Sequence, residues 1–321
     1  MSGTFSRRAF LRSASAVATG AGAMLAGCSS STIESALVPA RFIGFGDAFA
    51  DLGQTGKRYT VNDGSVNNWT QSLSASYGLS LNAVRDGGLS YAQGNARVAR
   101  TPDAAGNAAT PTVTQQITTF LAGKSFGATD VVVMAAGQAD IIAEMALLLA
   151  GGQSSDQLLA NVGAAGAAMG QQIQRLVKAG AKYVVVSGVY NLGRSPWASS
   201  VGQTALIEAA SSRFNEQLLI NIVDLGANVL YVDAMYYFNL MTASPNAYGL
   251  TDATTVVCNS VDATNGIGLG TGKVNAALCT PSTIVTGLTY STYLFADPVH
   301  LTPAAHALFA SYASTRLRAR W

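Results

Sequence analysis

Short apolar runs alternate along the chain with longer segments that carry apolar residues at helical spacing. Four runs rich in β-branched and aromatic residues predict strands at 41–45 (RFIGF), 130–136 (DVVVMAA), 182–186 (KYVVV) and 227–232 (ANVLYV). Because the second and third runs show no polar alternation, we expect strands that are buried on both faces, as in a parallel sheet.

Helical spacing predicts helices between and after these strands, at residues 68–76, 112–121, 141–149, 155–179, 204–225 and 302–317. Thr112 and Thr302 are the expected N-caps of two of them, and Pro303 takes the first helical position of the last. Strands that alternate with helices in this way predict an α/β fold with a doubly wound parallel sheet. Since no repeat and no linker is visible after Pro39, we expect one domain over residues 40–321.

The composition argues against several classes of protein. The 321 residues are 49% hydrophobic and 11% charged, with a formal net charge of +2, so a large core can form and global disorder is not expected. No basic tract offers a footprint for a phosphate backbone, so we expect no nucleic-acid partner. Three cysteines without a Cys-x-x-Cys spacing and two histidines, His300 and His306, give no reason to expect a metal site or a cofactor.

The first 27 residues have the order of an export signal peptide. An arginine pair, Arg7-Arg8, precedes an Ala/Gly-rich apolar run that ends at Leu25-Ala26-Gly27-Cys28. The run is too short and too weakly apolar for a membrane span, so we expect residues 1–27 to be removed. The segment resembles a twin-arginine signal followed by a bacterial lipobox. The resemblance implies folded export and a lipid anchor on Cys28; an ordinary secretory signal with an incidental cysteine is the alternative.

These expectations place the protein outside the cytoplasm. Residues 28–39 would be a lipidated tether, and the protein would be a lipoprotein of a bacterial cell envelope, periplasmic or attached to a membrane. Removal of residues 1–27, which hold three arginines and no acid, would leave a formal net charge of −1. The oligomeric state is left open.

Cys258 and Cys279 would then lie in an oxidising space, where they bracket a Gly/Asn/Thr-rich stretch with little periodicity. We expect a disulfide between them, which would contribute about 3 kcal/mol in the chain-entropy model; two buried free thiols are the alternative. Gly266, Gly268 and Gly270 lie within this stretch. Because no strand precedes them and no helix follows, we interpret them as loop glycines and not as a nucleotide site.

Three segments are expected at the carboxyl edge of the sheet, where chemistry occurs in this architecture. Residues 46–53 follow the first strand, residues 137–140 follow the second, and residues 297–300 precede the last helix. Asp297 and His300, three apart on a turn, can place the carboxylate on the imidazole Nδ1 and leave Nε2 as a general base. A structural role at the helix entry is the alternative for His300, and we interpret the helical His306 as structural.

The motifs in these segments carry a family resemblance. Gly46-Asp47-x-x-x-Asp51-x-Gly53, the YAQGNAR run at 91–97, Gly137-x-x-Asp140 and Asp297-Pro298-Val299-His300 together resemble the SGNH/GDSL hydrolase family, in particular its bacterial lipase/esterase branch. The resemblance implies a flavodoxin-like, three-layer α/β/α fold. It implies serine esterase, lipase or acylhydrolase chemistry on a small-molecule or lipid ester. Asp297 and His300 would activate the nucleophile, and Gly94 would belong to the oxyanion hole.

Two positions depart from the family pattern. Ala48 stands where the family has its nucleophilic serine, and Ala139 stands where it has the oxyanion asparagine. Alanine has neither a side-chain nucleophile nor an amide donor, so the acyl-enzyme route is closed at its first step. Two such losses in a chain that keeps its export signal favour natural divergence over an engineered trap.

Three functions stay open at this point. The first is residual ester hydrolysis, in which His300 activates a water and Gln138 or Asn95 donates to the oxyanion. The second is a non-catalytic envelope lipoprotein that binds an acylated lipid or glycan in the old ester pocket. The third is a structural or assembly lipoprotein of the cell envelope, which needs neither His300 nor the pocket.

Overall fold

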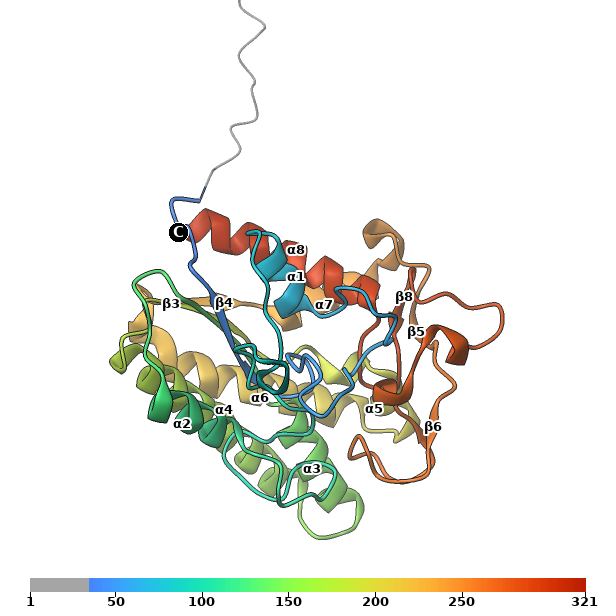
Figure 1. Ribbon diagram of the computed structural model, residues 1–321. Helices are drawn as coiled ribbons and strands as arrows, with labels where there is room; N and C mark the ends of the chain where they lie inside the picture. Colours follow the sequence, from blue (N-terminus) through green and yellow to red (C-terminus); the bar gives the residue numbers. More distant parts are fainter. Residues whose placement is uncertain (1–34) are drawn as a thin grey trace, which may run out of the picture. The chain divides into compact units, whose positions relative to one another are not determined.

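The centre of the fold is a parallel sheet with the strand order β1-β2-β3-β4 (Figure 1). The computed structural model describes residues 35–321. The strands are β1 (Phe42–Gly46), β2 (Val131–Ala135), β3 (Tyr183–Ser187) and β4 (Val229–Val232). Every residue of β1 and β2 is buried, so the apolar runs lie inside a sheet that is covered on both faces, as predicted.

One further residue pairs with the outer edge of β1. Ser90 forms a parallel bridge with Gly44, where a Cβ would lie 2.8 Å from the Ser90 Oγ. The chain therefore leaves β1 toward this edge and returns to β2 on the other side of β1. This reversal of the winding direction places a crevice at the carboxyl ends of β1 and β2.

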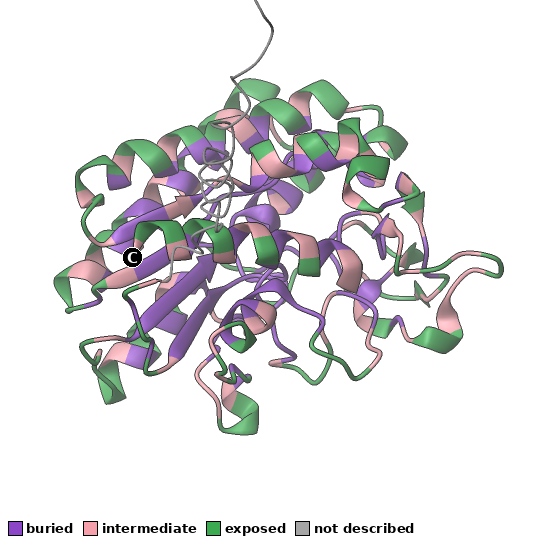
Figure 2. Cartoon of the chain, turned by 90° about the horizontal axis from the view of Figure 1, so that it is seen from above, coloured by how far each residue is buried: buried purple, intermediate pink, exposed green. Residues whose placement is uncertain are grey.

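Helices cover both faces of the sheet and complete three layers (Figure 1). One face carries α1 (Trp69–Ala75), α7 (Ala234–Ala243) and α8 (Pro303–Arg320). The other carries α2 (Val113–Gly123), α3 (Gln138–Leu149), α4 (Ser155–Lys178) and α6 (Thr204–Ile222), with the short α5 (Pro196–Ser200) before α6. Figure 2 shows the buried strands between helices whose outer sides are exposed. The predicted three-layer α/β/α fold is confirmed.

Side-chain caps begin α2 and α8 at the positions that the sequence indicates. The Thr112 hydroxyl accepts from the Gln115 amide at 3.2 Å, and the Thr302 hydroxyl accepts from the Ala305 amide at 3.3 Å. Pro303 occupies the first position of α8, as expected. All predicted helices and strands are confirmed, with ends that differ by a few residues, whereas α5 and α7 were not predicted.

Residues 244–301 leave the main sheet and return to α8. They hold two small sheets, in which β5 (Asp252–Val256) pairs parallel with β8 (Tyr293–Phe295) and β6 (Val261–Asp262) pairs antiparallel with β7 (Lys273–Val274). Single 3₁₀ turns lie here and elsewhere, at Val84–Asp86 (η1), Leu192–Arg194, Val223–Leu225, Pro245–Tyr248, Ala276–Leu278 and Pro281–Thr283. Cys258 and Cys279 form a disulfide, which confirms the predicted pairing.

The export signal at 1–27 and the anchor residue Cys28 lie outside the described residues, as does most of the tether at 28–39. Within residues 35–321, none of the helices combines the length and the apolarity that a bilayer crossing needs.

Candidate functional site

The turn after β1 joins the ends of two strands. Gly46 has a φ of +148°, and a Cβ there would lie 1.9 Å from a backbone oxygen at the end of β2, so only glycine fits. The next residue, Asp47, is buried, and its carboxylate accepts from the amides of Phe49 at 3.1 Å and Ala139 at 3.3 Å. Burial raises the pKa of Asp47 to about 6, and the two amides oppose this rise.

Ala48 follows directly, and its backbone amide is the one group at this position that can donate a hydrogen bond. Its side chain is 5% exposed, and its backbone amide donates to no acceptor within residues 35–321. The amides on either side are engaged, since the Asp47 amide donates to the Ala135 carbonyl and the Phe49 amide donates to the Asp47 carboxylate. Position 48 therefore offers a free backbone donor for an oxyanion but no nucleophile.

Asp297 and His300 form the expected pair. The Asp297 Oδ2 lies 2.7 Å from the His300 Nδ1, and the carboxylate also accepts from the amides of Val299 (2.9 Å), His300 (2.7 Å) and Ala276 (2.7 Å). Burial alone would raise the pKa of Asp297, but the charge and hydrogen bond of His300 and the amides hold it below its ordinary value. An ionised Asp297 holds a proton on Nδ1 and leaves Nε2 as the acceptor. A catalytic role for the pair stays a prediction.

The loop that carries His300 is fixed by residues from two other strand ends. The Val299 carbonyl accepts from the Gln138 Nε2 at 3.2 Å and from the Tyr190 hydroxyl. Gln138 begins α3 just after β2, and Tyr190 follows β3. Together with the bond between Asp47 and Ala139, these contacts bring the three predicted segments to the carboxyl edge of the sheet.

Gly94 packs against the ring of Tyr59, a residue that the sequence analysis did not single out. The ring centroids of Tyr59 and His300 are 4.9 Å apart, and a Cβ on Gly94 would lie 1.9 Å from the Tyr59 ring. The Gly94 amide donates to the Asp51 Oδ2 at 2.7 Å. An oxyanion would therefore compete with that carboxylate for the amide, and the oxyanion role of Gly94 stays a prediction.

The two side-chain amides considered as substitute oxyanion donors also have acceptors. Asn95 donates to the Tyr59 hydroxyl at 3.3 Å and to the Gly266 carbonyl at 2.8 Å. Gln138 donates to Val299. Both would have to change partners to reach an oxyanion, whereas the amide of Ala48 would not.

Asp140 faces away from this edge into a buried ion network. Its carboxylate accepts from the Val98 amide at 2.9 Å and lies 3.4 Å from the Arg97 Nε, and Arg97 also pairs with Glu144. Burial raises the pKa of Asp140, while the charge of Arg97 lowers it. Asp140 therefore fixes α3 to residues 97–98, and its charge adds to the rise in the pKa of Asp47.

His306 lies in α8 with no access to solvent. Its Nδ1 accepts from the Trp69 amide at 3.3 Å, and burial lowers its pKa to about 3. A neutral imidazole with one backbone partner agrees with the structural interpretation of this residue. Within residues 35–321, no group of three or more His, Cys, Asp or Glu side chains is placed to hold a metal ion.

A mostly apolar hollow adjoins the His300 loop. It has a volume of about 510 Å³, and its walls include Ile142, Leu149, Trp197 and Pro298. Pro298 lies two residues before His300, and its carbonyl accepts from the Trp197 amide at 3.1 Å. The hollow therefore borders the chain segment that carries His300, although His300 itself does not line it, and its size suits a small organic ligand.

Sequence reasoning missed Tyr59 and the partners of Asp51. Tyr59 belongs to no motif, and only the tertiary structure brings it onto His300. A signal for Asp51 was present, because an aspartate followed by Gly53 is typical of a turn in which the carboxylate accepts from nearby amides; here the Gly53 and Gln54 amides donate at 2.8 Å.

A parallel sheet between two helical layers, with a buried Asp and His pair at its carboxyl edge, defines a three-layer α/β/α protein with a candidate acid–base site. The chain belongs to the GDSL-like lipase/acylhydrolase family, whose model matches residues 43–313. That match includes every segment of the site from β1 to His300. A Pseudomonas putida protein described as an uncharacterized protein in the trpE-trpG intergenic region is 27% identical over 162 residues. The alignment covers 50% of this chain and 26% of that protein, so the chain spans about a quarter of the relative's length.

Proposed function

We propose that this protein hydrolyses a small ester with a water molecule, activated by His300, in the role of the absent serine. The observation that carries the proposal is the intact pair of Asp297 and His300, with a 2.7 Å hydrogen bond between carboxylate and imidazole. A purely structural histidine does not need a buried carboxylate with three further amide bonds. The family membership supports hydrolase chemistry in general.

The reaction follows from the groups present. The His300 Nε2 takes a proton from water, and the hydroxide adds to the ester carbonyl. The amide of Ala48 donates to the oxyanion of the tetrahedral intermediate. His300 then returns the proton to the alkoxide, which leaves as the alcohol while the carboxylic acid is released. We expect slow turnover, because loss of a triad member in serine proteases leaves only about 10³- to 10⁴-fold acceleration over water.

The acyl portion of the ester is proposed to occupy the hollow beside Pro298. Ile142, Leu149 and Trp197 give that hollow apolar walls, and its volume of about 510 Å³ exceeds the needs of a short acyl chain. A short-chain p-nitrophenyl ester is therefore a suitable probe.

The second candidate is binding of an acylated lipid or glycan without turnover. Two contacts favour this candidate. The Tyr59 ring packs against the His300 ring. The Gly94 amide donates to Asp51 and is therefore not free to donate to an oxyanion. Binding in the hollow needs its shape and none of the proton transfers.

Hydrolysis of p-nitrophenyl butyrate by the purified protein and three variants separates the candidates. His300→Ala removes the base, Ala48→Ser restores a hydroxyl at the family's nucleophile position, and Ala50→Ser adds a hydroxyl two residues away as the matched control. We expect weak activity that His300→Ala abolishes, a rise of about 10²-fold or more with Ala48→Ser, and no rise with Ala50→Ser. An inactive protein that becomes active with Ala48→Ser would favour binding, and inactivity of all forms would overturn the proposal of ester hydrolysis.

We also propose that the protein is exported and held at a membrane by lipid on Cys28. The arginine pair, the apolar run and the Leu-Ala-Gly-Cys sequence support this proposal. Labelling of the protein with radioactive palmitate in a bacterial host, with Cys28→Ser as the control, tests it. Equal labelling of both forms would exclude an anchor at Cys28.

A further inference from the structure

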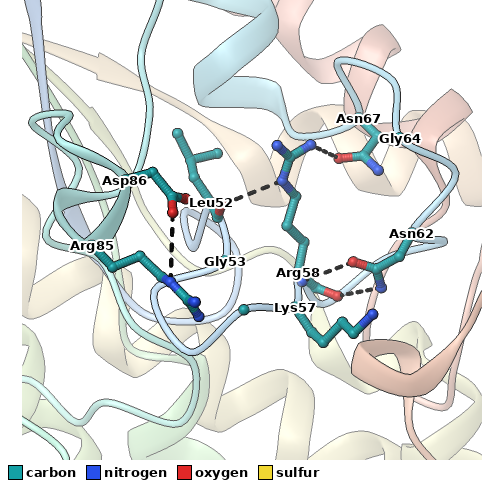
Figure 3. Close-up of a pocket in the computed structure, with 10 residues that line it drawn as sticks. Leu52, Gly53, Lys57, Arg58, Asn62, Gly64, Asn67, Arg85 and Asp86 are labelled. Atoms are coloured by element: carbon teal, nitrogen blue, oxygen red, sulfur yellow. Dashed lines mark hydrogen bonds and ion pairs between the residues drawn. The ribbon is translucent and has the colours of Figure 1, made fainter.

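A second hollow, lined mainly by polar and charged residues, lies between residues 52–67 and η1 (Figure 3). Its volume is about 350 Å³. Lys57, Arg58 and Arg85 line it, and Asp86 is the one acid among its lining residues. Since the whole chain carries a formal net charge of only +2, three cations around one hollow are a local concentration of positive charge.

Arg58 is held rigidly at the wall of this hollow. Its Nη1 donates to the Asn67 Oδ1 at 2.6 Å (Figure 3). The same Nη1 donates to the Ser65 carbonyl at 2.9 Å. Its own backbone is clamped by the Asn62 side chain, which accepts from the Arg58 amide and donates to the Arg58 carbonyl, both at 3.0 Å. The guanidinium is therefore pre-positioned before any ligand arrives.

The charge of Arg58 has no direct counter-ion. The acceptors of its side chain are neutral, and no ion pair within residues 35–321 includes Arg58 or Lys57. Burial lowers the pKa of Arg58, while the more distant carboxylates of Asp51, Asp63 and Asp86 oppose this. A partly buried guanidinium that lacks a carboxylate partner favours an anion from outside the chain.

Arg85 lines the same hollow and passes close to Gly56. A Cβ on Gly56, which has a φ of +101°, would lie 2.7 Å from the Arg85 Nη1. The Arg85 Nε lies 3.5 Å from the Asp86 carboxylate, and both side chains are about half exposed, so this pair is weak and its guanidinium can exchange partners.

We infer that this hollow binds a phosphoryl group. Arg85 provides a fork-shaped donor and Lys57 a point charge, the two kinds of donor that phosphate oxygens take. Arg58 adds its Nη2, since its Nε and Nη1 donate to Leu52, Ser65 and Asn67. The volume leaves room for a phosphate ester as well as for the free ion. The site does not depend on ester hydrolysis, although Arg58 directly precedes Tyr59, whose ring packs on His300.

Binding is tested by calorimetry with inorganic phosphate, glycerol 1-phosphate and glycerol, and by co-sedimentation with phosphatidylglycerol vesicles. We expect at least one phosphate-bearing probe to bind, glycerol not to bind, and affinity to fall with added salt. Tighter binding of glycerol 1-phosphate than of phosphate would assign a phosphate ester, preference for phosphate would assign the free ion, and binding to vesicles alone would assign a lipid headgroup. Each of these outcomes supports a phosphoryl site.

Two exposed side chains allow variants that leave the fold in place. Arg85→Gln and Lys57→Gln should each raise the Kd of the bound probe, by about tenfold for the arginine, because each removes a charged donor. Arg213→Gln is the matched control, since this exposed arginine lies on α6 outside the hollow. Absence of binding by every phosphate-bearing probe up to about 10 mM, or unchanged binding in both hollow variants, would overturn the inference.

Discussion

Replacement of His306 by asparagine should make the protein less sensitive to acid. In the folded protein burial lowers the pKa of His306 from 6.5 to about 3. The unfolded chain therefore binds a proton below pH 6.5 that the folded chain does not bind until about pH 3, so acidification favours unfolding. Asparagine does not titrate, and its Oδ1 can replace the Nδ1 as acceptor for the Trp69 amide, which donates at 3.3 Å.

The magnitude follows from the shift in pKa. Between pH 6.5 and about 3, His306 removes about 1.4 kcal/mol of unfolding free energy per pH unit, or about 2.7 kcal/mol at pH 4.5. Asp47 and Asp51 act in the opposite sense. Burial raises the pKa of each to about 6 from 3.8, so the stability they contribute at low pH is lost as the pH rises toward 6. Because both aspartates stay in the variant, their contribution cancels in the comparison.

The assay is urea unfolding of the protein and of His306→Asn at several pH values between 8 and 4.5. The variant loses the stacking of the imidazole on Phe49, whose ring centroid lies 5.5 Å away, and this loss is independent of pH. We therefore expect a less stable variant at pH 8 and a difference that shrinks by about 1.4 kcal/mol per unit below pH 6.5. Two curves that stay parallel down to pH 4.5 would refute the buried, neutral state of His306.

Two further predictions concern the framework. The double change Cys258→Ser and Cys279→Ser should lower the unfolding free energy by about 3 kcal/mol in urea titrations, because it opens a loop between two cysteines 21 positions apart. A reductant should lower the stability of the unchanged protein by a similar amount. Equal stability of the unchanged protein, the reduced protein and the double variant would contradict this prediction. Arg97→Met should cost about 3 kcal/mol or more, because two buried carboxylates lose their shared cation. Arg213→Met, at an exposed pair with Glu216, should change stability by less than about 0.5 kcal/mol, and similar losses in both variants would argue against a buried network.

The main elements could be predicted because local signals and tertiary burial agree there. The VVVMA run of β2 is buried on both faces, and Thr302 with Pro303 caps α8 where the pattern begins. The short α5 and α7 were missed for physical reasons. α5 has five residues, too few for a periodic pattern, and α7 has apolar residues around most of its circumference, so no single face stands out.

The site was predictable only in part. Asp297 and His300 are three residues apart, so their contact is local and can be read from the sequence. The partners that hold them are not local: the Ala276 amide comes from the disulfide-bonded stretch, and Gln138 and Tyr190 come from other strand ends. Tyr59 reaches His300 across 241 positions, and no spacing rule connects two such residues.

The support of Asp297 and His300 includes nothing from position 48. The Asp297 carboxylate is held by the amides of residues 276, 299 and 300 and by the His300 imidazole. The Val299 carbonyl between them is held by the side chains of Gln138 and Tyr190. Loss of a hydroxyl at position 48 therefore removes no interaction that holds the rest of the machinery. In a lineage with this architecture, an exchange of serine and alanine at position 48 can therefore remove or restore the nucleophile, in either direction, without disturbing the pair.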